Sequence, residues 1–407
     1  MKADKNIVVF ITLVSLFNAR TVLNAQVKNS VYSMFGVGQI ADNSFGINKS
    51  MGGTGIAFQS GSSLNYSNPA SYLGIPPNSF NMELGAIGIL SRAESKSIVQ
   101  TTGDLNFGYC ALSLYVSKWW AAMLGVAPFS SVDYEIHTTD NVEGELIPFE
   151  KEFTGTGGLS KVFVGNSFHI FKGLAGGVNV SLIFGPITQT EIAISSGSFS
   201  GYELTNHQTA YSFYMDYGLQ YSIRKNDWQY TVGLIYGASK RLTVTSELDF
   251  TYDDVTTTLE QKEQVGIKIP EKRGIGFAIK KGNQFRAGID YEWRKWATIN
   301  FSNPNLDTRN SNRFSAGLEF TPMKRDSWLK RLSYRMGAHY SNSYLEIKNT
   351  QINSIGVVAG VGIPNKLISL FNIAFEYGSE GTLDKGLIRN DYWMMDFSFS
   401  VHEFWGR

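Results

Sequence analysis

Hydrophobic and polar residues alternate with a period of two along most of this chain. Successive side chains of a β-strand point to opposite faces of its sheet, so this alternation predicts strands with one apolar and one polar face. It recurs at 229–250, 331–340 and 371–377, which makes the predicted fold class all-β. In the clearest window Phe285, Ala287, Ile289, Tyr291 and Trp293 share one face, and Gln284, Arg286, Gly288, Asp290 and Glu292 share the other.

The alternation, followed from turn to turn, predicts about fourteen strands. They are mostly about ten residues or longer, the length that a tilted strand needs to cross a membrane. Short turns such as Lys281-Gly282-Asn283 alternate with long polar loops near 138–147, 252–268, 301–309 and 380–389. The strands are expected near 79–92, 103–117, 119–137, 148–165, 172–196, 200–224, 226–251, 269–282, 283–300, 310–324, 328–342, 352–364, 367–379 and 390–403.

Short turns at one end and long loops at the other are typical of an outer-membrane barrel, although a soluble sandwich would also alternate. Closure of the sheet would leave no strand edge exposed. The last strand ends in Phe404-Trp405, as suits a closing strand. We therefore predict that residues 77–407 form a transmembrane antiparallel β-barrel of about 14 strands, a multi-pass protein of the bacterial outer membrane. Tryptophans near strand ends are expected in its interfacial girdles: Trp119, Trp120, Trp228, Trp293, Trp296 and Trp393.

Residues 1–25 have the features of a secretory signal peptide. A charged start is followed by an apolar run over residues 7–17 and by Ala25 before Gln26. The run is about half of the ~20 residues that a spanning helix needs, and a buried N-terminal helix is the alternative. Cys110 is the only cysteine, so neither an internal disulfide nor a lipid anchor at the cleavage point is expected.

Candidate chemistry is sparse. Charged residues make up only 17% of the chain and nearly balance at +1, without a basic run, so a nucleic-acid partner is not expected. No Gly-x-Ser-x-Gly elbow occurs, and the stretch GTGGLSK at 155–161 lacks the Gly-Lys-Ser/Thr of a phosphate loop. We therefore expect no enzyme, no catalytic residue, no metal and no cofactor, with a Ser/His barrel lipase as the alternative. None of the five histidines has metal-ligand spacing: His137, His169, His207, His339 and His402.

A glycine-rich and nearly uncharged segment, SMGGTGIAFQSGSSLNYSNPASY at 50–72, precedes the first predicted strand. Glycine permits tight turns and close backbone approach, so Gly52, Gly53 and Gly55 suit a segment packed inside another structure. Pro69 fixes a bend, and Asn68 can bond nearby backbone. The alternative, a disordered tail, would leave large apolar side chains in water: Phe35, Met51, Ile56, Phe58 and Tyr66.

The stretch at 31–72 resembles the N-terminal region of FadL/OmpP/TodX-like outer-membrane proteins, which transport long-chain fatty acids and other hydrophobic molecules. The matching parts are Met51-Gly52-Gly53-Thr54-Gly55, the region of Ala57, and Asn68-Pro69-Ala70. The tail EYGSEGTLDKGLIRNDYWMMDFSFSVHEFWGR resembles the branch of this family found in Bacteroidota. The resemblance covers both ends of the chain, whereas the middle matches only in pattern.

In that family the segment before the first strand folds into the barrel as a hatch. The resemblance therefore implies that residues 26–76 form a hatch or plug. It also implies a kinked third strand that opens the wall beside the hatch. Pro128 would mark this kink because proline removes a ladder donor; a bulge or rim position is the alternative. The implied hatch residues are Phe35, Gly52, Gly53, Gly55, Asn68, Pro69 and Ala70.

The resemblance implies passive uptake of hydrophobic small molecules, with long-chain fatty acids as the default ligand and hatch-gated lateral release into the membrane. Outer-membrane lipid and the hydrophobic ligand are the expected partners. The alternative is a non-transporting barrel that serves as an accessory or shuttle subunit of an outer-membrane protein secretion or assembly machine, with outer-membrane protein partners. The polar lumen residues fit either role: Arg286, Asp290, Glu292, Arg335 and Glu376.

Overall fold

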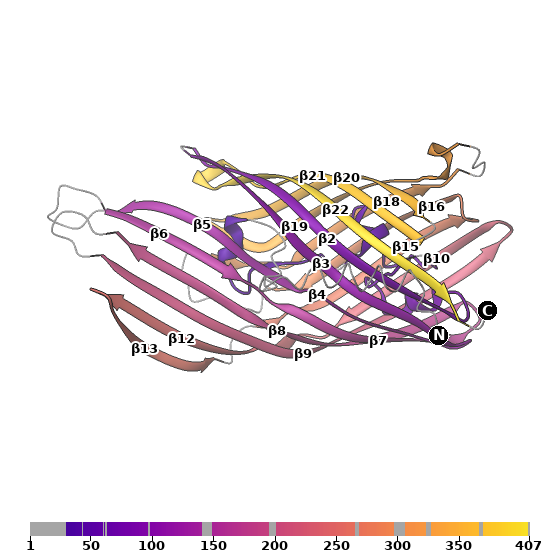
Figure 1. The fold of residues 1–407 in the computed structure, drawn as a ribbon, viewed down its shortest axis with the longest axis horizontal. Helices are drawn as coiled ribbons and strands as arrows, with labels where there is room; N and C mark the ends of the chain where they lie inside the picture. The colour runs from indigo at the N-terminus through magenta and orange to yellow at the C-terminus, as the bar shows by residue number, and fades with distance from the viewer. Residues whose placement is uncertain are drawn as a thin grey trace, which may run out of the picture.

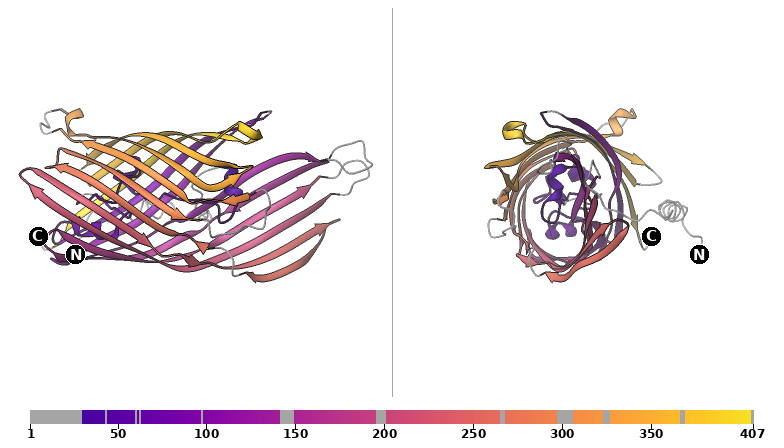
Figure 2. Two further views of the ribbon diagram at one scale, coloured as in Figure 1. Left: turned by 180° about the vertical axis from the view of Figure 1, so that it is seen from behind. Right: turned by 90° about the vertical axis from the view of Figure 1, so that its left-hand side faces the viewer.

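The computed structural model describes residues 30–42, 44–59, 61, 63–96, 98–140, 149–194, 201–264, 268–296, 306–322, 327–365 and 369–405. Within this part of the chain, 14 antiparallel wall strands close into a barrel, as the alternation predicted (Figure 1). The segment before the first wall strand lies inside the barrel, as the view along the barrel axis shows (Figure 2). The predicted signal peptide, residues 1–25, falls outside the described residues.

The 14 wall strands, several of which consist of more than one labelled piece, pair with their neighbours in chain order, and the first and last pair to close the barrel. The first, β2 (Ser79–Glu94), pairs with the last, β22 (Arg389–Phe404), from one end to the other. The strands between them are β3 (Val99–Ser117), β4 (Trp120–Pro128), β5 (Ser130–Asp140), β6 (Phe149–Gly157), β7 (Ser160–Phe171), β8 (Leu174–Ala193), β9 (Tyr202–Lys225), β10 (Trp228–Gly237), β11 (Lys240–Arg241), β12 (Thr243–Tyr252), β13 (Val255–Gln264), β14 (Lys268–Ile269), β15 (Glu271–Lys281), β16 (Phe285–Lys295), β17 (Leu306–Thr308), β18 (Ser311–Phe320), β19 (Ser333–Ile347), β20 (Thr350–Asn365) and β21 (Ser369–Gly381). The pieces that together make one wall strand include β4 with β5, β6 with β7, β10 with β12, and β13 with β15.

The wall has an apolar outer face and a polar inner face. Ile289 is 59% exposed on the outside of β16, whereas its neighbour Asp290 is 8% exposed on the inside. On β9 the odd-numbered residues from Tyr211 to Ile223 form an outward apolar row. Beyond Tyr211 the same outer face turns polar, with the exposed residues His207 and Thr209 on it. On this side of the barrel, β9 therefore extends beyond the apolar row that faces the hydrocarbon layer.

Several predicted elements differ from the structure. The single strands expected at 119–137 and 148–165 are each broken, the first between β4 and β5 at Phe129 and the second between β6 and β7. The polar loop expected at 252–268 contains β13, because Asp253 and Asp254 adopt φ of 54° and 60° and turn the chain straight back onto β12. Trp296 is not in a girdle: it is buried inside the barrel and stacks on Tyr344, with ring centroids 4.1 Å apart.

The segment inside the barrel has little regular structure. It contains the 3-10 turn η1 (Val31–Met34), the short strand β1 (Gln39–Ile40), the helix α2 (Gly46–Lys49) and the 3-10 turn η2 (Pro69–Gly74). No helix among the described residues is long and apolar enough to cross a membrane. Because so few residues of the segment inside the barrel belong to helices or strands, most of its backbone groups must find partners elsewhere.

The outward apolar row yields a stability prediction. Leu219 lies in the middle of the row on β9, and Thr209 lies on the same face beyond it. Leu219→Arg places a charge at hydrocarbon depth and should destabilise the barrel by roughly 2–4 kcal/mol. Thr209→Arg is the matched control and should change the unfolding free energy little. Urea unfolding of both variants in lipid vesicles measures this difference in unfolding free energy. Equal unfolding free energies would show that the hydrocarbon layer does not surround Leu219.

Candidate functional site

The candidate site is the contact between the barrel wall and the residues inside it. We call described residues 30–78 the luminal segment. Its side chains are as buried as those of a protein core: Met51 and Asn68 are both 0% exposed. Aromatic rings contribute, since Phe45 stacks on Tyr109 of β3 with ring centroids 3.9 Å apart. The luminal segment therefore packs against the wall as a core packs against a sheet.

Nine wall strands meet the luminal segment through a glycine, and we call these residues the glycine belt. A Cβ atom at Gly218 would lie less than 3.0 Å from Asn68, and one at Gly337 less than 3.0 Å from Met51, closer than real Cβ atoms come. Gly317 and Gly337 are direct partners in the β18–β19 ladder, and both touch Met51. Backbone thus packs on backbone. The belt comprises Gly165, Gly177, Gly218, Gly233, Gly276, Gly288, Gly317, Gly337 and Gly360.

Two buried carboxylates of the wall accept hydrogen bonds from backbone N–H groups of the luminal segment. Asp290 of β16 accepts from Gly55 at 2.6 Å and from Ile56 at 2.9 Å. Glu83 of β2 accepts from the N–H of Leu64 at 3.1 Å, and also from two hydroxyls of neighbouring strands. Hydrogen bonds to a carboxylate are shorter and stronger than neutral ones. The wall thereby satisfies donors that the irregular segment leaves open.

Asn68 connects three parts of the site. Its Oδ1 caps η2 by accepting from the N–H of Ala70 at 3.0 Å, with Pro69 at the first position of the turn. Its Nδ2 donates to the carbonyl of Ile56 at 2.8 Å and to the wall carbonyl of Leu219 at 3.2 Å. The triplet Asn68-Pro69-Ala70 therefore lies against β8 and β9, where the belt residues Gly177 and Gly218 leave room for it.

The other predicted hatch residues lie at the wall as well. Gly52 and Gly53 have φ of +70° and +84°, a region that L side chains rarely adopt. Gly55 has no such φ, but a Cβ there would lie less than 3.0 Å from Ser67. Phe35 accepts a hydrogen bond on its carbonyl from the Tyr344 hydroxyl at 3.1 Å. The structure brings these residues together; their part in gating stays a prediction.

A cavity of about 250 Å³ remains between the luminal segment and the wall. Arg313 of β18 pairs with Asp42 at its edge at 2.9 Å, and Lys49 pairs with Asp396 of β22 at 2.8 Å. Burial alone would raise the pKa of Asp42, but Arg313 and Lys49 outweigh it and lower that pKa below its usual range. Uncharged polar residues and charged or ionisable ones line the cavity in similar numbers; the second group comprises Asp42, Lys49, Asp290, Glu292, Arg294, Arg313, His339, Glu376 and Glu380.

Pro128 lies where the wall divides. It is the last residue of β4, which pairs with β3 only over Cys110–Ser117. After the break at Phe129, β5 moves away from β3 (Figure 1). Among the described residues, β3 pairs from Val99 to Tyr109 with β2 alone. We call the space between this length of β3 and β5 the seam.

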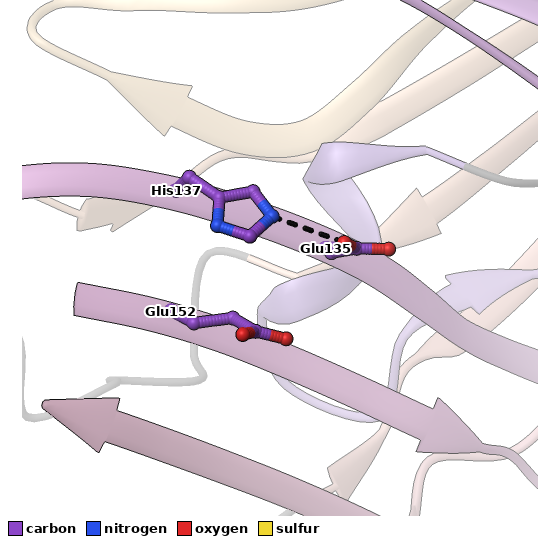
Figure 3. A group of neighbouring side chains, drawn as sticks. All are labelled: Glu135, His137 and Glu152. Carbon is purple, nitrogen blue, oxygen red and sulfur yellow. Dashed lines mark hydrogen bonds and ion pairs between the residues drawn. The ribbon is translucent and has the colours of Figure 1, made fainter. Parts of the chain in front are cut away.

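Sequence spacing missed one group of metal-ligating side chains. Glu135 and His137 alternate on β5, and His137 pairs directly with Glu152 of β6. Their ligand atoms all lie within 4.8 Å of one another, and His137 bonds to Glu135 at 3.0 Å (Figure 3). Motif spacing did not reveal this group, and the expectation that the protein binds no metal stays a prediction. Glu152 is 15 residues from His137 in the sequence, and only the pairing of β5 with β6 brings the two together. A search for motif spacing does not detect such a pair.

Comparison with known families gives one match to the sequence. A family model described as BamG matches residues 4–407. No curated protein matches the sequence significantly.

Solved structures share the fold at low sequence identity. The toluene transporter TbuX of Ralstonia pickettii superposes with a TM-score of 0.61 at 16% identity, covering 89% of this chain and 99% of its own. The toluene transporter TodX of Pseudomonas putida gives 0.61 at 15% identity, with 90% and 100% covered. A FadL homologue of Pseudomonas aeruginosa gives 0.59 at 10% identity, with 91% and 100% covered. The fold is thus that of a FadL-like outer-membrane barrel.

The glycine belt yields a prediction that separates packing from barrel stability. Gly337→Val places a branched side chain against Met51 and should displace the luminal segment, because the wall there is backbone. Gly88→Val on β2 is the control, since a Cβ there meets only Leu105 at 3.9 Å. Limited proteolysis in detergent should cut the luminal segment faster in Gly337→Val alone. Both barrels should keep their heat-modifiable mobility, and equal cleavage would show that the belt does not hold the segment.

Proposed function

Because the chain belongs to the BamG family, we propose that it is a plugged barrel subunit of an outer-membrane protein assembly machine. The sequence left this accessory role open beside transport. The family name favours it, since Bam abbreviates barrel assembly machine. The match runs through almost the whole chain, including the wall and the luminal segment.

The attachment of the luminal segment to the wall is the structural observation that supports this role. Glycine contacts on nine strands, two buried carboxylates and Asn68 hold the segment. A plug that gates transport has to release some of these contacts, whereas a subunit that works through its wall or rims can keep all of them. The remaining cavity is lined by ion pairs, an environment that an apolar solute enters only at a cost in desolvation.

Transport of hydrophobic molecules is the second candidate. The solved structures of the same fold include proteins described as toluene transporters and a monoaromatic hydrocarbon channel. In this candidate function, the seam beside Pro128 is the lateral exit, the luminal segment is the gate, and long-chain fatty acids are the default ligand. The gate would have to break the Arg313–Asp42 pair and the bonds to Asp290 in order to open.

A deletion strain distinguishes the two functions. If the chain serves assembly, its loss should lower the amounts of several other outer-membrane proteins at least twofold in quantitative proteomics. Uptake of a radiolabelled long-chain fatty acid and of toluene should stay unchanged. The opposite result, with lost uptake and an unchanged outer-membrane proteome, would establish transport instead. Re-expression of the intact chain controls for secondary effects of the deletion.

Single-channel conductance tests whether the luminal segment is a plug. Planar bilayers would carry the wild type, Gly53→Val and a variant that lacks Lys28 to Ser71. The wild type should conduct little, and the deletion should open a pore because the wall closes on itself without the segment. Gly53→Val should conduct intermittently, since valine is strained at φ of +84°. Equal conductance of all three folded proteins would contradict the plug.

A further inference from the structure

One strand edge of the barrel is open at the depth of the membrane. β3 has no described partner on its seam side from Val99 to Tyr109. Leu105 on this stretch is 74% exposed and points outward. Gly88 of β2 pairs with Leu105 on one side and with Met395 of β22 on the other. Leu105 therefore lies at the same height in the barrel as Met395, which is another outward apolar residue. Unpaired N–H and C=O groups cost several kcal/mol each in hydrocarbon, so lipid-exposed sheet edges do not occur there.

The chain itself covers the opposite edge of the seam by adding a strand. Gln39 and Ile40 of β1 pair with Ser131 and Ser130 of β5 in antiparallel register. Further along, the Ser33 hydroxyl donates to the carbonyl of Asp133 and accepts from its N–H. The luminal segment thus takes the place of a missing neighbour for β5. For this stretch of β3 no described residue does so with its backbone, although the side chains of Asp104 and Asp133 meet across the seam.

A buried amide beside the β3 edge lacks a partner. The Nδ2 group of Asn106 is shielded from solvent, and it donates no hydrogen bond within the described residues. Asn106 itself is only 7% exposed. A buried donor without an acceptor is destabilising, so buried amide groups are almost always hydrogen-bonded. The unmatched donor lies on the same stretch of β3 as the unmatched edge.

We propose that the seam is a β-augmentation site, at which an extended segment of a partner polypeptide adds to β3 along Val99–Tyr109. This inference rests on the proposed function, because an assembly subunit requires a protein partner. The added backbone pairs the open edge, and one of its carbonyls accepts from Asn106. The incoming segment alternates like a membrane strand. Its outward side chains lie beside Leu105 in lipid, and its inward side chains lie beside Thr102 and Asp104.

Photo-crosslinking in cells tests the register of this pairing. A photoreactive amino acid replaces Thr101 or Leu105 on β3, with Phe213 on β9, 64% exposed on the outer face, as the control position. Mass spectrometry of the adducts should place the crosslinks from 101 and 105 on one partner segment, about four residues apart, because paired strands advance together. The control should give no adduct on that segment. Adducts with lipid only, with scattered proteins, or with no molecule would overturn the proposal.

A proline scan tests whether the contact uses the backbone. Proline replaces Thr101, Thr102, Gly103 and Asp104 in turn, with the crosslinker at Leu105 and alanine at the same positions as the control. The effect of proline should alternate from one position to the next, because successive N–H groups of a strand point to opposite neighbours. Where the N–H faces β2, proline should weaken the heat-modifiable barrel; where it faces the seam, the barrel should persist and the crosslink should fall at least tenfold. Loss of the crosslink without this period of two, or equal loss with alanine, would exclude strand addition.

The two levels of inference fail separately. If the deletion strain loses outer-membrane proteins while the seam gives no register-matched adduct, the assembly function stands and β3 is not the docking edge. If the deletion strain loses only fatty-acid or toluene uptake, the assembly function falls. In that case the absence of adducts at Thr101 and Leu105 would indicate that lipid or solute, and not a polypeptide, contacts the seam.

Discussion

Close approach between the luminal segment and the wall backbone is the constraint on which the rest of this structure depends. Met51 rests on Gly317 and Gly337, and Asn68 rests on Gly218, at distances that leave no room for a Cβ. The wall therefore gives up one side chain on each of nine strands, and these glycine positions gain nothing from cross-strand side-chain pairs on the inner face. The luminal segment compensates by supplying the core that this face would otherwise lack.

The same close packing sets the polarity of the lumen. The luminal segment makes few regular hydrogen bonds of its own, so its N–H groups need acceptors on the wall. Asp290 and Glu83 supply them, and burying these carboxylates is tolerable because each accepts at least two bonds. Arg313 in turn donates to the backbone carbonyl of Gly52 at 3.2 Å, besides its pair with Asp42. A polar lumen is thus a consequence of holding an irregular segment inside a barrel.

The sequence predicted what depends on periodicity. The alternation through Ile289 and Asp290 assigned the two faces correctly, because the side-chain period of a strand is independent of its neighbours. Contacts across the lumen have no such signal. Trp296 resembles a girdle residue in sequence, yet it lies inside because the chain beyond β16 turns it onto Tyr344. The approach of Glu152 to His137 depends on the register of β5 and β6, which the polar turn between them does not reveal.

The plug and the seam follow from one bend in the wall. Beyond Phe129, β5 leaves β3 and pairs with Gln39 and Ile40 of the luminal segment. Its inward side chain Val132 is buried in one cluster with Val37 and Leu159. β5 and β3, both described throughout, form no ladder with each other, and burial of Val132 in this apolar cluster offsets that cost for β5. Among the described residues, β3 has no such backbone partner on its side of the seam. The same bend that lets the luminal segment pair with β5 thus leaves the edge of β3 without a ladder partner.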